Sequence, residues 1–210
     1  MSEVKIKYIG HAAFKLSATQ AEIVIDPYED GTVPGLAAMR EEADYVYCSH
    51  GHFDHNYVQA VTLRAQAGER PFGLEELSIP HDDCGGTKRG PNTVCIFELD
   101  GLRIAHMGDT GRILTEEEKA KLSGLDCLLI PVGGFFTIDA HEAKAIVDQI
   151  KPKVVIPMHY RKGSIGFDVI GTVEPFLAGF QNVNYGGSEF TLTAETPAQV
   201  LVLTPAAAQE

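Results

Sequence analysis

The chain has 210 residues, of which 44% are hydrophobic and 22% are charged, as is typical of a soluble globular domain. Its formal net charge of −12, from 17 Lys and Arg against 29 Asp and Glu, repels nucleic-acid phosphates, so we expect no RNA or DNA partner. No apolar run reaches the roughly 18 residues of a membrane span and no signal peptide is recognisable, so we expect a cytoplasmic protein without a membrane partner.

The first quarter of the chain is strand-like. Alternating apolar residues predict strands at residues 4–9, 12–16 and 22–25, and Asp26-Pro27 ends the third because proline cannot donate to a ladder. A loop rich in Gly and Pro leads to another strand at 45–48.

The rest of the chain mixes strands with helices. Residues 94–99 and 102–105 predict a hairpin across Asp100-Gly101, whereas Thr115 and Asp139 each begin a helix. Further strands are expected at 127–130, 154–156, 190–193 and 200–203. This order predicts one layered α/β domain with two sheets over residues 1–205, followed by a frayed tail at 206–210.

A dense cluster of metal-ligand residue types follows the strand at 45–48. Because residues two apart point the same way in extended chain, His50 and His52 can bind one ion. Asp54 and His55 lie where the chain turns, and they can face a second ion. A polar loop that contains histidines by chance is the alternative, but ligands at this density rarely serve packing.

Three more ligand candidates each follow a predicted strand: His81, Asp109 in Gly108-Asp109-Thr110-Gly111, and His159 in Pro157-Met158-His159-Tyr160. Four ligands from one loop would enclose an ion poorly, so partners from distant loops are expected. Strand ends joined by glycine turns would present all seven side chains at one edge of a sheet.

The order His-x-His-x-Asp-His, lone His, Gly-Asp-Thr-Gly and Pro-Met-His-Tyr resembles the metallo-β-lactamase superfamily, over residues 10–159. More narrowly it resembles the metal-dependent hydrolases related to L-ascorbate-6-phosphate lactonases and to N-acyl-phosphatidylethanolamine phospholipase D. The resemblance implies an αββα four-layer sandwich, in which helices flank two mixed sheets and two metals lie at one edge. It assigns His50, His52 and His81 to one metal, Asp54, His55 and His159 to the other, and Asp109 as the bridge.

The resemblance implies a metal-dependent hydrolase that uses a metal-bridging hydroxide, oriented by Asp54, on an ester-type bond of a small anionic substrate. Phosphodiesters, lactones and other esters remain open as substrates. True β-lactamases tend to carry a cysteine where this chain has Asp109, which argues against antibiotic hydrolysis. Two divalent ions are expected, zinc first, with manganese, nickel or iron as alternatives.

Two other functions are alternatives to hydrolysis. A non-haem iron redox protein is the alternative on the same scaffold, but such relatives tend to carry a carboxylate where this chain has His52. A metal-binding module without catalysis would leave a complete site idle. The sequence leaves open whether the chain forms a homo-oligomer.

Several residues near the motifs are candidates for substrate binding. Lys88 and Arg89 follow His81 and would hold an anion, unless they are only solvated loop charges. Phe135, Phe136 and Thr137 lie in a glycine-rich turn that would line the site, although the phenylalanines could equally belong to the core. Tyr160 is a candidate donor to a substrate oxygen.

The remaining histidines and the cysteines are not predicted as metal ligands, with His11 left open. His11, in a Gly-His-Ala turn, is either near the metals or a hydrogen-bonded turn residue, and both interpretations stay open. His106 is expected to be packed, His141 exposed on a helix, and Cys84 a free loop thiol. The four cysteines form no Cys-x-x-Cys pair, so they are expected to be reduced.

Overall fold

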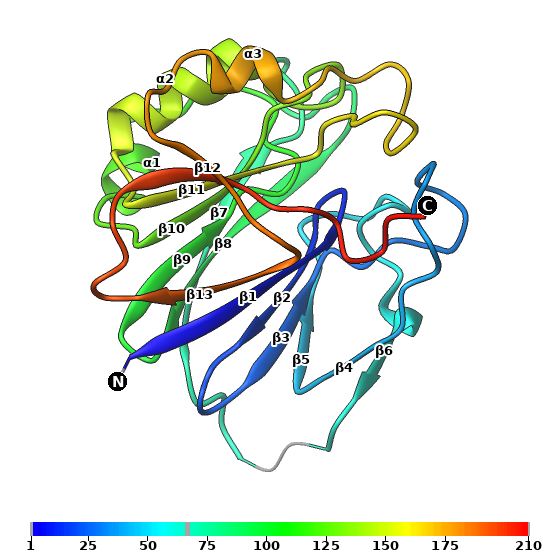
Figure 1. Ribbon diagram of the computed structural model, residues 1–210, viewed down its shortest axis with the longest axis vertical. Coiled ribbons are helices and arrows are strands. Elements are labelled where there is room, and N and C mark those ends of the chain that lie inside the picture. Colours follow the sequence, from blue (N-terminus) through cyan, green and yellow to red (C-terminus); the bar gives the residue numbers. More distant parts are fainter. Residues whose placement is uncertain (1, 66–67, 210) are drawn as a thin grey trace.

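The computed structural model describes residues 2–65 and 68–209. Two mixed sheets face each other across the molecule (Figure 1). The five-stranded sheet has the order β13 (Glu189–Thr193), β1 (Glu3–Gly10), β2 (Ala13–Ser17), β3 (Glu22–Ile25) and β5 (Tyr45–Tyr47). The seven-stranded sheet has the order β12 (Val183–Tyr185), β14 (Gln199–Val202), β11 (Val154–Met158), β10 (Cys127–Pro131), β9 (Leu102–His106), β8 (Pro91–Leu99) and β7 (Gly73–Pro80).

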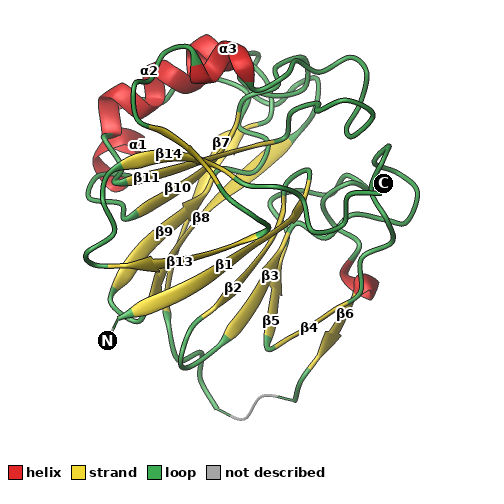
Figure 2. Cartoon of the chain, viewed as in Figure 1, coloured by secondary structure: helices red, strands yellow, loops and turns green. Residues whose placement is uncertain are grey.

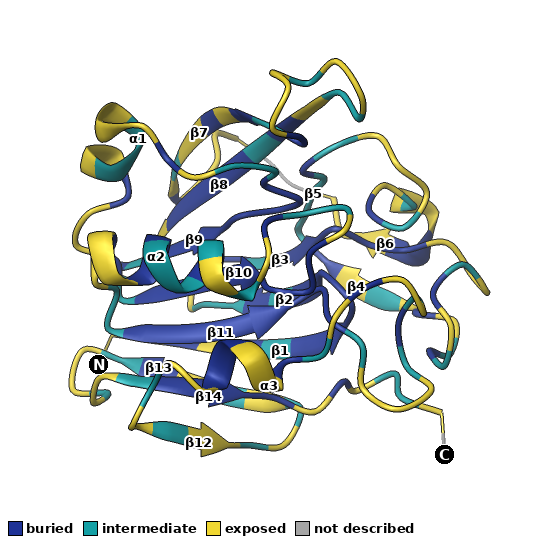
Figure 3. Cartoon of the chain, turned by 90° about the horizontal axis from the view of Figure 1, so that it is seen from above, coloured by how far each residue is buried: buried dark blue, intermediate teal, exposed yellow. Residues whose placement is uncertain are grey.

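The alternation of side chains along the strands builds two cores. In β10, Leu129 points toward the five-stranded sheet and packs with Phe14 and Ile25. Its neighbours Leu128 and Ile130 point the other way, toward the helices. Because β10 and β11 are buried on both faces, they are apolar along their whole length (Figure 3).

The helices α1 (Glu116–Lys121), α2 (Ala140–Ile150) and α3 (Glu174–Leu177) all cover the outer face of the seven-stranded sheet (Figure 2). The predicted capping boxes form at Thr115 with Glu118 and at Asp139 with Glu142. The predicted apolar face of α2 is buried. No helix in the described part of the chain is long and apolar enough to cross a membrane.

The metallo-β-lactamase fold expected from the motifs is confirmed, but its fourth layer contains no α-helix in the described residues. The outer face of the five-stranded sheet is covered by residues 26–41, the 3₁₀ helix Val58–Ala60 and the small sheet of β4 (Glu41–Ala43) and β6 (Val61–Leu63). Pro27, Pro34 and the glycines between and after them break helical structure in this covering segment.

The tail that the sequence predicts to be frayed is hydrogen-bonded to the rest of the chain at residues 206–209, and Glu210 lies outside the described residues. The amides of Ala206 and Ala207 donate to the carbonyl oxygens of Tyr8 and Ile9 over 2.9 and 3.0 Å, and Gln209 donates to Gly35 over 2.9 Å. The end of the chain therefore extends the covering of the five-stranded sheet. The strand predicted before His81 is the eight-residue β7.

Candidate metal centre

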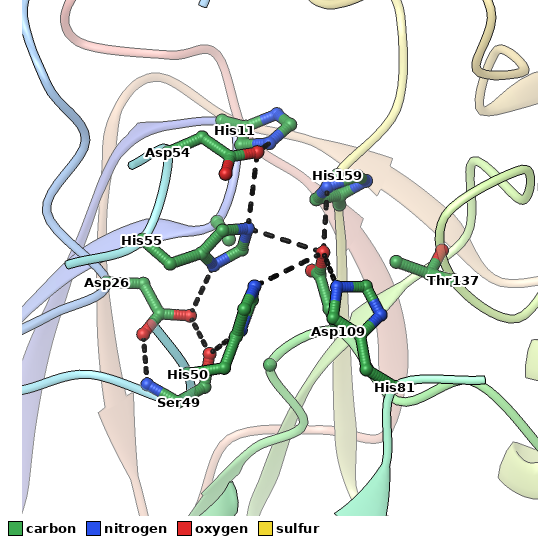
Figure 4. Close-up of polar contacts among 12 residues, drawn as sticks. His11, Asp26, Ser49, His50, Asp54, His55, His81, Asp109, Thr137 and His159 are labelled. Atoms are coloured by element: carbon green, nitrogen blue, oxygen red, sulfur yellow. Dashed lines mark hydrogen bonds and ion pairs between the residues drawn. The ribbon is translucent and has the colours of Figure 1, made fainter. Parts of the chain in front are cut away.

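The seven predicted ligands converge at one edge of the two sheets (Figure 4 labels all except His52). They come from four loops, which follow β5, β7, β9 and β11. One group of ligand atoms that lie within 4.8 Å of one another contains His50, His52 and His81. A second group contains His11, Asp54, His55 and His159. The set that the sequence predicted is therefore brought together, and His11 joins it.

The carboxylate of Asp109 lies between these two groups. Its Oδ2 is 3.3 Å from Nε2 of His81 in the first group and 3.3 Å from Nε2 of His159 in the second. Nε2 of His55 is 3.4 Å away and Nε2 of His50 is 3.9 Å away. A carboxylate in this position can offer an oxygen to an ion in each group.

Several buried polar atoms of this centre lack hydrogen-bond partners. They include Nε2 of His50, His55 and His159 and Oδ1 of Asp109. Buried polar groups are nearly always paired, because an unpaired one costs free energy. Cations bound among these nitrogen and oxygen atoms would satisfy them, so the donor set fits divalent metal ions.

Asp26 contacts a histidine of each ligand group, His55 directly and His50 through Ser49. The sequence does not single out this residue as part of the site. Its Oδ2 accepts a hydrogen bond from the hydroxyl of Ser49 at 2.6 Å and lies 2.8 Å from Nδ1 of His55. The Ser49 hydroxyl in turn lies 2.9 Å from Nδ1 of His50. Burial alone would raise the pKa of Asp26, but His55 and His106 lower it, so the carboxylate is charged. It orients both rings through the nitrogens that face away from the metals.

Glycines on both sides of Asp109 allow the other ligand loops to approach. A β-carbon at Gly108 would collide with Ser49, which precedes His50. A β-carbon at Gly111 would collide with the backbone of His81. The Gly-Asp-Thr-Gly motif therefore brings the loops after β5 and β7 against Asp109.

Three non-glycine residues of the centre have left-handed backbone conformations. The φ angles are +58° for His11, +49° for Asp26 and +52° for His159. Such angles are uncommon outside glycine and concentrate at functional sites. The amide of His159 donates to the carbonyl of His11 over 2.8 Å, so these two turns join the sheets beside the second group.

The two open interpretations of His11 are resolved in favour of a place in the centre. Its Nε2 lies 3.2 Å from Oδ2 of Asp54. Burial, followed by the neighbouring His159, lowers the pKa of His11 to about 4, so the ring is neutral at physiological pH. His106, by contrast, is packed as predicted, since its Nε2 lies 2.9 Å from the carbonyl oxygen of Ala12.

A cavity of about 320 Å³ opens above the centre. Its lining combines ligand residues with an apolar wall and one arginine: His52, Phe53, Asp54, His81, Arg89, Asp109, Phe136 and Phe167. The guanidinium of Arg89 donates to the carbonyl of Phe135 over 2.9 Å and lies 5.7 Å from the centre of the Phe136 ring. The cavity therefore offers a cation and aromatic surface next to the metal ligands.

Comparisons with known proteins agree with this geometry. Residues 5–159 match the family model described as the Beta-lactamase superfamily domain. The chain belongs to this superfamily. It is 32% identical to a UPF0173 metal-dependent hydrolase of Thermococcus onnurineus over 75% of this chain and 84% of that protein. A namesake from Pelotomaculum thermopropionicum is 29% identical over 99% of this chain and 100% of its own length.

A solved structure supports the same assignment. A protein of Thermotoga maritima, assigned to the Zn-dependent hydrolases of the metallo-β-lactamase superfamily, superimposes with a TM-score of 0.74 at 30% identity. The match covers 95% of this chain and 98% of that one. The chain is thus a member of a family of metal-dependent hydrolases.

Several side chains that the sequence predicts as substrate contacts do not lie in the cavity. The ammonium of Lys88 lies 3.5 Å from Asp83 on the surface, and Phe135 is 61% exposed outside the cavity lining. Tyr160 is buried in the core beneath the helices, and burial raises its pKa to about 12. The Thr137 hydroxyl donates to the carbonyl of Ile138 over 3.0 Å. These four side chains do not line the cavity.

Of the predicted substrate contacts, Arg89 and Phe136 do line the cavity, and the sequence interpretation missed Phe53 and Phe167. Phe53 lies between two predicted ligands, which was a usable signal, whereas nothing in the sequence connects Phe167 with the centre. Cys84 and His141 are exposed, as predicted.

Proposed function

We propose that this hydrolase binds two divalent ions and uses them to cleave an ester-type bond of a small anionic substrate. The observation that carries the proposal is the Asp109 carboxylate, within 3.3 Å of a histidine nitrogen in each ligand group. A ligand set dominated by imidazole favours zinc, with manganese, nickel and iron as alternatives.

Two such ions, when bound, would supply an acidified water as the nucleophile and a Lewis acid that polarises the carbonyl or phosphoryl oxygen of the substrate. The residues of the chain do the positioning. Asp26 fixes the ring plane of His55 directly and that of His50 through the Ser49 hydroxyl, in each case at the Nδ1 atom of the ring. Asp54 lines the cavity and His11 contacts its carboxylate, so Asp54 is placed to accept a proton and to return it to a leaving group.

The charge of the cavity supports an anionic substrate. Asp54 and Asp109 contribute −2 and Arg89 contributes +1 to the lining. Two divalent ions add +4, which gives a formal sum of +3 inside a molecule whose net charge is −12. Fixed positive charge in a partly desolvated cleft attracts an anion strongly. Phosphodiesters, lactones of acidic sugars and esters of dicarboxylic acids all meet this requirement.

The test is a substrate panel with protein reconstituted in zinc, manganese, nickel or iron. Bis(p-nitrophenyl) phosphate, a neutral p-nitrophenyl ester, an acidic ester and a lactone would be compared, with chelated protein as the control. We expect metal-dependent hydrolysis that is faster for the anionic members. Oxygen consumption by the iron form without hydrolysis of any member would contradict the proposal and favour the redox alternative.

A further inference from the structure

Three phenylalanines form the apolar side of the cavity. Phe53 is 56% exposed although it stands between two ligand residues. The rings of Phe136 and Phe167 meet edge to face, with centroids 5.9 Å apart. Phe167 also contacts His11, at 5.3 Å between ring centroids. A large apolar side chain left exposed at the rim of a site is typical of a surface that a ligand covers.

Arg89 occupies a fixed position beside this wall. The bond to Phe135 uses one of its five N–H donors, and the Phe136 ring covers one face of the guanidinium. The backbone amide of Arg89 is also held, because it donates to the buried carboxylate of Asp82 over 2.9 Å. A cation whose backbone and head group are both anchored loses little freedom when it binds an oxyanion.

We propose that the substrate is amphiphilic: a ring-sized apolar group packs against Phe53, Phe136 and Phe167, and an oxyanion separate from the bond that is cleaved binds Arg89. This inference rests on the proposed function and names the substrate class of the same site. The cavity of about 320 Å³ lies at the lower end of the range for small-molecule sites. It therefore fits a molecule with one ring rather than a polymer or a long lipid chain.

The test measures binding without turnover. Calorimetric titration of the metal-loaded protein would compare 3-phenylpropionate, which has both features, with propionate and 3-phenylpropanol, which have one each. We expect 3-phenylpropionate to bind roughly tenfold more tightly than either of the others, since both contacts contribute. Propionate measures any binding of a carboxylate to the metals alone.

Two neighbouring pairs in the sequence provide matched variants. Arg89→Gln should weaken 3-phenylpropionate roughly tenfold or more, whereas Lys88→Gln, which alters a surface cation, should not. Phe136→Leu should remove most of the preference for 3-phenylpropionate over propionate, whereas Phe135→Leu should retain it. If Arg89→Gln fails to fold by circular dichroism, Arg89→Lys replaces it, with an intermediate loss expected because the charge remains but the fork is lost.

Equal affinities for the three probes would overturn the inference, as would equal effects of the Arg89 and Lys88 variants. The two proposals fail separately. Hydrolysis of the ester panel without the amphiphile preference contradicts only the substrate class. The amphiphile preference without hydrolysis contradicts only the proposed function.

Discussion

Asp26 shows how a single residue outside the ligand set controls the centre. It is fully buried, and its carboxylate is shared between Ser49 and His55. In the sequence, Asp26 precedes Pro27, and this pair predicts only the end of a strand. The ligand motif could be predicted because its residues are adjacent, whereas the role of Asp26 depends on β3 pairing in parallel with β5.

Replacing the carboxylate of Asp26 should therefore destabilise the fold as well as the site. For Asp26→Asn we expect a loss of roughly 3–5 kcal/mol in the free energy of unfolding. The reason is that the buried partners Ser49 and His55 lose the negative charge of the carboxylate that they contact. Ser49→Ala removes one hydroxyl from the same network and should cost roughly 1–2 kcal/mol. Urea unfolding of chelated protein measures both without the contribution of metal binding. Equal losses in the two variants would show that the carboxylate has no special role.

The loop after β7 is the element that joins a metal ligand to the cavity cation. The buried Asp82 carboxylate accepts hydrogen bonds from the amides of Cys84, Gly86, Lys88 and Arg89, at 2.8 to 2.9 Å. Burial acts to raise the pKa of Asp82, but these four donors outweigh it and lower the pKa to about 2. Asp82 thus holds the segment between His81 and Arg89 in one conformation.

Asp82→Ala should release this loop and expose the bonds after Lys88 and Arg89 to trypsin. We expect cleavage there at least tenfold faster than in the unchanged protein, since proteolysis follows local opening. Asp83→Ala is the matched control, because Asp83 is exposed and contacts only the ends of Lys88 and Cys84 among the described hydrogen bonds. Rates that rise equally in both variants would contradict the role of Asp82. Mass spectrometry of the fragments identifies the bond cleaved.

Helix α1 provides a pH-dependent prediction. The hydrogen bond from Arg112, opposed by burial and helped by the Thr115 cap, lowers the pKa of Glu118 from 4.5 to about 2. A depressed carboxyl pKa stabilises the fold above the unfolded value, and this contribution is lost as pH falls from about 4.5 to about 2.

Glu118→Gln should therefore lower the melting temperature at pH 7 by about 2–4 °C, for a loss of about 1 kcal/mol. The difference from the unchanged protein should shrink as the pH approaches about 2. Glu117→Gln, at a position where the side chain is 82% exposed, should leave the melting temperature unchanged. Calorimetric scans across this pH range would contradict the assignment if the effect of Glu118→Gln were constant.

At the scale of the whole molecule, the sequence predicts those helices and strands that are marked by residues close together in the chain. The hairpin of β8 and β9 and the capped helix α2 carry turn and cap residues at fixed offsets, and both form as expected. Strands β4, β6 and β12 are three residues each and lack the run of strand-favouring residues that marks the equally short β5. The non-helical outer layer and the bound tail depend on packing against the five-stranded sheet, which no local pattern reports.

The same distinction explains the candidate site. Ligand residues could be predicted because metal chemistry restricts them to a few types in a dense motif. The cavity wall could be predicted only at Phe136, because Phe167 meets that ring only after the chain folds. Adjacent residues such as Lys88 and Arg89 look alike in sequence, yet one faces the surface and the other the cavity.

A metal titration tests most directly whether two ions bind, one on either side of Asp109. Chelated protein would be titrated with zinc while bound metal is counted by mass spectrometry and hydrolysis is followed. We predict two ions per chain, one ion for His159→Asn, and weakened binding of both for Asp109→Ala. Asparagine is chosen at His159 because it tolerates the left-handed φ of +52°. A single ion at saturation in the unchanged protein, or two tightly bound ions in Asp109→Ala, would contradict the account.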